Sequence, residues 1–395
     1  MNVGEPRTAQ IDRTLTTATY FASLAVIGLV YGATAPTLQS LATQAGVGLG
    51  TIGVILSARS LGYLVGASQL GRFLDRRGGH RFMAGILIAC AILLAWVPVM
   101  RSLWSLALLM GFIGCTLAGP DVGSNTLMLR LRRDRPGPYM NALHLFFGLG
   151  ALLSPLLVAA TRSEGSVAAP YRWLALVVAL IGGAFLFRPE PTIPARGSDV
   201  EESTQVRRTL LLACIPFALY VGAEVGFSSW VFEFARAMRT ELGATSLTAA
   251  FWIAFTAFRF VGVLVAMKVS PFRVVMTCFV TGIAASGLLL ASSSSSAGVW
   301  LGTILLGAGI AAIYPTFILL LGERMTMTGR RLGIVAVAST VGSMTFPWMI
   351  GRFFTSWGPE AVPLIVGADL AIASLVVAVV FRRPRSTTPT AERRR

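Results

Sequence analysis

Long apolar stretches separated by short polar connections make up most of the chain. Each stretch has roughly 20 residues, the length that an α-helix needs to cross the hydrocarbon of a bilayer. The pattern therefore predicts an all-α membrane protein with twelve transmembrane helices. The predicted helices cover residues 15–41, 50–72, 82–100, 103–129, 138–161, 170–187, 209–235, 246–267, 272–291, 298–322, 332–355 and 361–381.

The composition agrees with a lipid environment. Of the 395 residues, 55% are hydrophobic and only 13% are charged, whereas about a quarter of the residues of a soluble domain are charged. The first apolar stretch is longer than the roughly 7 to 15 apolar residues of a signal peptide, so we interpret it as an uncleaved helix. We therefore expect the lipid bilayer to be the main partner of the protein surface.

Basic residues are concentrated in alternate loops and in the C-terminal tail. The net charge of +16 would suggest nucleic-acid binding in a soluble protein, but this alternation favours the positive-inside bias of a membrane protein instead. Both termini are then cytoplasmic, and we expect a multi-pass protein of the cell membrane that binds no nucleic acid. Of the 33 Lys and Arg residues, only six lie in the opposite loops: Arg101, Arg162, Arg172, Arg236, Arg239 and Arg352.

The cysteines give no sign of a metal site or a disulfide. Cys90, Cys115, Cys214 and Cys278 each fall alone within an apolar stretch, without the paired Cys or His spacing of a zinc site. We expect free, buried thiols, no metal and no cofactor, except for Na⁺ or H⁺ as a coupling ion.

The chain divides into two halves of similar length. The longest polar connection, residues 188–208, separates a first six-helix bundle, residues 1–187, from a second, residues 209–395, which ends in a basic tail. We interpret residues 188–208 as a cytoplasmic linker. Small residues and prolines recur in the two halves, as a parallel duplication predicts, although they also serve close helix packing. The recurring sets are Arg59 and Gly62 with Arg259 and Gly262, Gly150 and Pro155 with Gly342 and Pro347, and Gly114 and Pro120 with Gly307 and Pro315.

A motif in the loop after the second predicted helix resembles the signature of the major facilitator superfamily. The segment Gly71-Arg72-Phe73-Leu74-Asp75-Arg76-Arg77-Gly78-Gly79-His80-Arg81 is similar to the family pattern Gly-x-x-x-Asp-Arg-x-Gly, with Gly79 inserted before the basic residues. Such a loop can hold one gate closed, because an Asp at a helix end interacts with a helix N-terminus or with an Arg of the other half; a positively charged anchor is the alternative. The predicted gating residues are Gly71, Asp75, Arg76, Gly78 and Arg81.

Four further segments resemble a narrower branch, the fucose-proton symporters and the sodium-dependent glucose transporters. They are residues 58–66, 120–125, 142–155 and 220–227 with Trp230. The resemblance implies two pseudo-symmetric six-helix bundles with a central cavity lined by the first, fourth, seventh and tenth helices. The fucose symporters resemble one another in an acid on the first helix, which this chain lacks, so their coupling scheme does not transfer as a whole.

Five charged residues lie more than one turn from either end of a predicted helix, where ionisable groups are rare and costly and indicate function. Asp121 and Glu224 lie on helices that line the cavity by the resemblance, and we predict that they bind the coupling ion. The alternative is that they form fixed ion pairs with Arg59 and Arg259, respectively. We expect Asp369, on the last helix, to be structural.

A sugar offers hydroxyl groups for hydrogen bonding and an apolar face for stacking, which directs attention to polar and aromatic side chains on the same helices. Asn125 is one turn from Asp121 and shares its face. For His144, a purely structural hydrogen bond is as good an explanation as binding. The predicted substrate-binding residues are Arg59, Asn125, Asn141, His144, Gln39, Tyr31, Tyr220, Trp230 and Arg259.

Other classes of function find no support in the sequence. A phosphate loop needs Gly-Lys-Ser/Thr, but the single lysine, Lys268, is followed by Val269. The two histidines lie in separate segments and no nucleophile motif is present, so the sequence offers no enzyme active site. We therefore predict a monomeric secondary transporter of a small polar solute, a sugar in the first place, driven by a proton or sodium gradient. The alternative is a proton-coupled exporter of drugs or metabolites.

Overall fold

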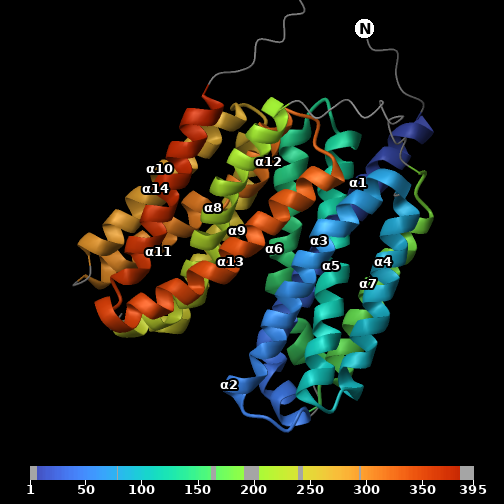
Figure 1. The fold of residues 1–395 in the computed structure, drawn as a ribbon, viewed down its shortest axis with the longest axis horizontal. Helices are drawn as coiled ribbons and strands as arrows, with labels where there is room; N and C mark the ends of the chain where they lie inside the picture. The colour runs from blue at the N-terminus through green and yellow to red at the C-terminus, as the bar shows by residue number, and fades with distance from the viewer. Residues whose placement is uncertain are drawn as a thin grey trace, which may run out of the picture.

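The computed structural model describes residues 7–77, 79–161, 166–190, 204–238, 243–292 and 295–382. These residues form helices and connecting turns, with no β-strand among them. The helices form two bundles, one from each half of the chain (Figure 1). The architecture is thus the predicted all-α, twelve-helix arrangement in two bundles.

The first bundle contains six long helices and two short ones. They are α1 (Arg7–Gln44), α2 (Leu49–Ile52), α3 (Val54–Arg77), α4 (His80–Trp96) with the 3₁₀ turn η1 (Val97–Val99), α5 (Leu103–Leu131), α6 (Pro136–Thr161) and α7 (Ala168–Leu186). The second bundle contains α8 (Thr204–Ala237), α9 (Ala244–Val265), α10 (Pro271–Ala291), α11 (Ser296–Ile310), α12 (Ile313–Gly322), α13 (Gly329–Trp357) and α14 (Ala361–Phe381).

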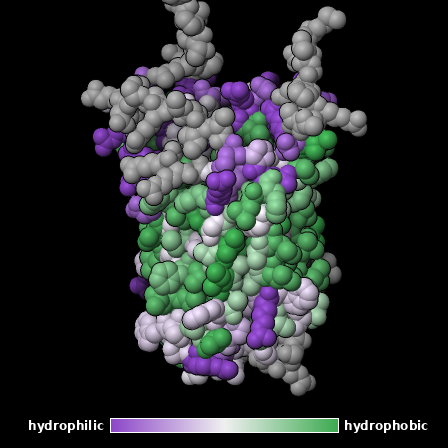
Figure 2. All heavy atoms as spheres, turned by 90° about the vertical axis from the view of Figure 1, so that its right-hand side faces the viewer, coloured by the Kyte–Doolittle hydropathy of each residue, from purple (hydrophilic) through white to green (hydrophobic). Residues whose placement is uncertain are grey.

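Within the described residues, eleven spans are long and apolar enough to cross a membrane. Helices α11 and α12 together make one of them, Ser296–Gly322, interrupted just before Pro315, a residue that cannot continue the helical hydrogen bonding. The twelfth helix, α3, is less apolar because it carries Arg59 and several hydroxyl and amide side chains, and it contacts α13 of the other bundle. The surface in Figure 2 shows a broad apolar band between two polar ends, as a bilayer requires.

The two bundles meet at one end of the molecule and diverge toward the other (Figure 1). We call the end at which α1 begins and α14 ends the termini end, and the opposite end the open end. Contacts between the bundles run from α3 to α13, from α6 to α9 and α12, and from α5 to α13. The structure is therefore closed at the termini end.

Glycines make this closure possible, because backbones can approach each other closely only where no Cβ intervenes. A Cβ on Gly71 of α3 would lie 2.1 Å from the carbonyl oxygen of Gly329 of α13. One turn further into the membrane, a Cβ on Gly333 would lie 2.2 Å from the carbonyl oxygen of Ala67. Gly71 thus lies at the closed interface.

The rest of the predicted gating loop is only partly described. Gly78 and the side chains of Asp75 and Arg76 lie outside the described residues, so their roles stay predictions. Beyond the inserted Gly79, the backbone N–H groups of His80 and Arg81 each donate a 3.0 Å hydrogen bond to the carboxylate of Glu190. Arg81 Nε also lies 3.8 Å from Glu190 Oε1. A carboxylate at a helix N-terminus is favourable, so this contact connects the start of α4 to the segment after α7.

Equivalent contacts in the two bundles support the duplication, but they align one pair of residues differently from the sequence. Gly150 packs on Ala25 and Gly342 packs on Ala218 with the same distance, 1.9 Å from an added Cβ to the carbonyl oxygen. Gly114 and Gly307 correspond in the same way, and their partners are Arg59 and Phe251, respectively. By these contacts Arg59 corresponds to Phe251, so the sequence match of Arg59 with Arg259 is wrong.

Gly333→Ala is expected to shift the protein away from the closed termini end, because the added Cβ clashes with Ala67 only while the bundles touch. Spin labels at the exposed open-end positions Arg101 and Ser356 should then report a shorter distance across the open end. Gly287→Ala, in open space on α10, is the matched control. Equal distance distributions for both variants would contradict a role of Gly333 in closure.

Candidate functional site

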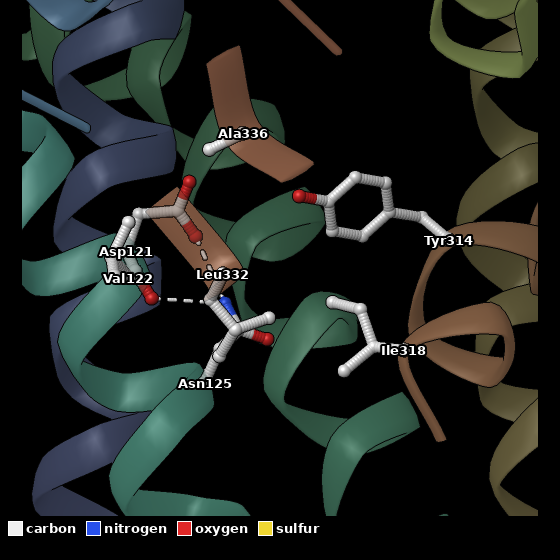
Figure 3. Close-up of a pocket in the computed structure, with 7 residues that line it drawn as sticks. All are labelled: Asp121, Val122, Asn125, Tyr314, Ile318, Leu332 and Ala336. Atoms are coloured by element: carbon white, nitrogen blue, oxygen red, sulfur yellow. Dashed lines mark hydrogen bonds between the residues drawn. The ribbon is translucent and has the colours of Figure 1, made fainter. Parts of the chain in front are cut away.

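A small cavity lies between the bundles, in the middle of the molecule. Its wall combines residues of α5 with residues of α12 and α13, and Figure 3 shows them in place. Tyr314, from the interrupted helix pair, points its hydroxyl group into this cavity toward Asp121 (Figure 3). The lining residues are Asp121, Val122, Asn125, Tyr314, Ile318, Leu332 and Ala336.

Asp121 lies in this wall and is held by neutral donors. Tyr63 of α3 donates its hydroxyl hydrogen to Asp121 Oδ2. Asn125 donates from Nδ2 to Asp121 Oδ1 at 3.0 Å and to the Asp121 backbone carbonyl at 2.9 Å (Figure 3). Among the described residues no Lys or Arg lies within ion-pair distance of this carboxylate. Asp121 is thus a polar group with room for a cation.

The same network continues from Asn125 to α6. His144 Nε2 lies 3.2 Å from Asn125 Oδ1, and the His144 ring packs edge-on against Tyr314, with the ring centroids 5.1 Å apart. Since Asn125 Oδ1 can only accept, His144 carries its proton on Nε2 in this arrangement. His144 therefore contacts both bundles.

The second acid, Glu224, belongs to a cluster on the other side of the interface. Tyr220 donates a 2.5 Å hydrogen bond to Glu224 Oε2, and Arg259 Nη2 lies 3.9 Å from Glu224 Oε1. The guanidinium of Arg259 also lies 4.3 Å above the ring of Phe255. The ion pair between Glu224 and Arg259 that the sequence offered as an alternative is thus present.

Arg259 connects the two clusters. Its Nη1 donates a 2.7 Å hydrogen bond to the backbone carbonyl of His144, across the interface between α9 and α6. Arg259 is only 4% exposed, and a hydrogen bond from a buried charged donor is among the stronger ones. The polar groups from Tyr63 to Tyr220 therefore form a path that crosses from one bundle to the other.

Arg59 is not part of this path. It donates from Nη1 to Thr34 Oγ1 at 2.6 Å, and its guanidinium lies 4.2 Å above the ring of Tyr31. The ion pair of Arg59 with Asp121 that the sequence offered as an alternative is absent from the described residues. Arg59 and Tyr31 do lie together, as two candidates for substrate contact.

The remaining candidates lie apart from the cavity wall or outside the described residues. Trp230 donates a 2.9 Å hydrogen bond from Nε1 to the carbonyl of Pro347 and thereby connects α8 to α13. Asn141 is buried against Gly262, and its Oδ1 has no described partner. The side chain of Gln39 lies outside the described residues. Asp369 is 5% exposed on α14, which packs on α8 and α10.

Sequence reasoning missed two tyrosines of the site. Tyr63 follows Arg59 by one helical turn on α3, and that spacing could have indicated a shared face. Tyr314 precedes Pro315 at the interruption between α11 and α12, and interrupted helices are where transporters place binding groups.

The cluster of Glu224 and Arg259 can be tested by removing its charges one at a time. Glu224→Gln and Arg259→Gln should each lower stability, by about 1 to 3 kcal/mol, because each leaves one buried charge without its partner. The double variant should regain stability, since no lone charge remains. Thermal unfolding and gradient-driven uptake are measured for all three variants. Full uptake by the double variant would refute a role of Glu224 in ion coupling.

Comparison with known proteins agrees with this geometry. The sequence model of the Major Facilitator Superfamily matches residues 20–347. The human sodium-dependent glucose transporter 1 is 26% identical over 403 residues, covering 91% of this chain and 77% of the relative. The rat protein of the same name is 28% identical over 391 residues, with 87% and 80% covered.

Solved structures share the fold. The transporter FucP in the outward conformation superposes with a TM-score of 0.78 at 16% identity, covering 93% of this chain and 99% of FucP. The proton:xylose symporter XylE gives a TM-score of 0.75 at 14% identity, covering 93% and 95%. Since the family's sequence model extends through both bundles, the chain belongs to the Major Facilitator Superfamily.

Proposed function

We propose that the protein transports a sugar across the membrane, coupled to a gradient of H⁺ or Na⁺, by alternating access. The observation that carries the proposal is the carboxylate of Asp121, which lines the cavity between the bundles and, among the described residues, has only neutral hydrogen-bond partners. A carboxylate in such a place can bind a proton or a metal cation and release it when the exposure of the cavity changes.

The relatives support a sugar as the substrate. The similar curated proteins are named sodium-dependent glucose transporters, and two solved structures of the same fold are named fucose:proton and proton:xylose symporters. The side chains around the cavity fit this class, because Asn125 and Tyr314 offer hydrogen bonds, and an aromatic ring suits the apolar face of a sugar.

The distribution of basic residues supports an orientation. The termini end contains most of the arginines, including Arg130 in the last turn of α5 and Arg132 and Arg133 after it, so the positive-inside bias favours a cytoplasmic termini end in the cell membrane. The closed termini end then makes this structure an outward-facing state, in which a solute would enter from the outside.

The path across the interface suggests how ion binding is coupled to the change of state. Opening the termini end must separate α6 from α9 and so break the hydrogen bond from Arg259 to the His144 carbonyl. Binding of a cation at Asp121 compensates the charge of the carboxylate and weakens the hydrogen bonds that it accepts from Tyr63 and Asn125. Asn125 also contacts the His144 side chain, so the change reaches the residue whose backbone carbonyl accepts from Arg259.

The test is uptake of a panel of sugars into proteoliposomes under separately imposed proton and sodium gradients, with wild type and Asp121→Asn. The amide keeps the shape of the side chain and can accept the hydrogen bond from Tyr63, but it takes up no proton and has no negative charge to attract Na⁺, so accumulation should fall to the level without a gradient. Asp369→Asn, at a buried carboxylate on α14, is the matched control and should accumulate sugar normally.

Two results would refute the proposal or part of it. Equal accumulation by Asp121→Asn and wild type would remove the coupling role of Asp121. If no sugar is taken up and a proton gradient drives the efflux of drugs or metabolites, the protein is a proton-coupled exporter and the proposal of sugar transport is refuted.

A further inference from the structure

Arg59 is a cation inside the membrane-spanning part of the first bundle without an acidic partner. Among the described residues no carboxylate lies within ion-pair distance of it. Within the described part of the chain its one hydrogen bond goes to the neutral hydroxyl of Thr34, and Tyr31 covers one face of the guanidinium. Its Nε is buried and has no described partner. A charge left this way in the membrane is costly, so a compensating anion is expected during the transport cycle.

Arg59 does not line the cavity, but it lies on the face of α3 that is directed toward the other bundle. Residues 59, 63, 67 and 71 follow one stripe of α3, since residues four apart share a helix face. Ala67 and Gly71 touch α13 of the other bundle, and Tyr63 reaches Asp121. Arg59 therefore lies one turn, about 6 Å, beyond Tyr63 toward the open end. A solute that enters from the open end meets Arg59 before it meets Asp121.

The charges of the site indicate which charge this solute has. Arg259 is balanced by Glu224, and Arg59 is balanced overall by Asp121, although the two do not touch. Once a proton or Na⁺ occupies Asp121, the site has one uncompensated positive charge, at Arg59. A solute with one negative charge restores neutrality before the site closes, whereas a neutral sugar leaves a net charge in a medium where that is costly.

We propose that Arg59 binds the carboxylate of the transported solute, which is a monoanionic sugar acid such as a hexuronate. The proposal rests on the proposed function as a sugar transporter and names the class of sugar. A guanidinium matches a carboxylate through two parallel hydrogen bonds, and among the described residues only Nη1 of Arg59 has a hydrogen-bond partner. A sugar phosphate fits less well, because its charge of about −2 exceeds the single unpaired cation.

The experiment compares sugars that differ only at C6: D-glucuronate with D-glucose, and D-galacturonate with D-galactose. Binding to the purified full chain is measured by calorimetry, and uptake is measured in proteoliposomes under the coupling gradient. Wild type should bind each hexuronate at least about tenfold more tightly than its hexose, because hydrogen bonds to charged groups are the stronger ones. Arg59→Gln should lower hexuronate affinity by roughly ten- to hundredfold and hexose affinity by much less, so that the preference for the hexuronate is lost.

Two further variants separate charge from geometry and from general effects. Arg59→Lys keeps the charge but lacks the planar fork, so its hexuronate affinity should lie between those of wild type and Arg59→Gln. Arg273→Gln, at an exposed arginine near the start of α10, should behave as wild type. If Arg59→Gln does not fold, the wild-type preference and Arg59→Lys still decide the question.

The outcomes are distinct. Binding and uptake of hexoses but not of hexuronates, or an equal loss of both in Arg59→Gln, overturns the proposal for Arg59 and leaves the sugar transporter standing. Transport of neither class overturns both proposals.

Discussion

The cost of charge inside hydrocarbon is the constraint on which the centre of this protein depends. Polar groups in the membrane must satisfy one another, and here the buried acids do so within their own bundles. Asp121 and Glu224 each accept a hydrogen bond from a tyrosine of the same bundle, and Arg259 donates across the interface to a backbone carbonyl. The contact of Arg259 therefore links the two clusters across an interface that must move.

Close backbone contact is the second requirement, and glycine meets it. Gly71 and Gly333 of opposite bundles bring α3 and α13 together at the termini end. Such contacts have no side chains to interlock, so they can close and separate without repacking a core. The same feature within each bundle, as in Gly150 on Ala25, serves permanent packing instead. The location of a glycine, between bundles or within one, decides which of the two roles it has.

Residue type alone predicted which groups matter but not how they pair. Asp121 and Arg59 are opposite charges on helices that touch, and the sequence left an ion pair between them open as the alternative to ion coupling. In the structure, Asp121 instead accepts a hydrogen bond from Tyr63, and Arg59 donates one to Thr34. Which side chains meet depends on how each helix is rotated about its axis and on how deep it lies in the membrane. A shift of one helix by a turn changes the partners of its side chains, and the composition of the chain does not reveal such a shift. The apparent repeat of Arg59 in Arg259 failed for the same reason.

The sequence by itself determined the solvent, the helices and the family, because spans of about 20 apolar residues and a loop motif are local properties of the chain. It also identified the buried charges, since an ionisable residue within an apolar run is visible without coordinates. Only the tertiary structure decided which end is closed, which tyrosines complete the site and that Arg59 has no acid beside it among the described residues. These depend on contacts between segments far apart in the chain, such as α6 with α9 and α3 with α13, and no local pattern encodes the geometry of those contacts.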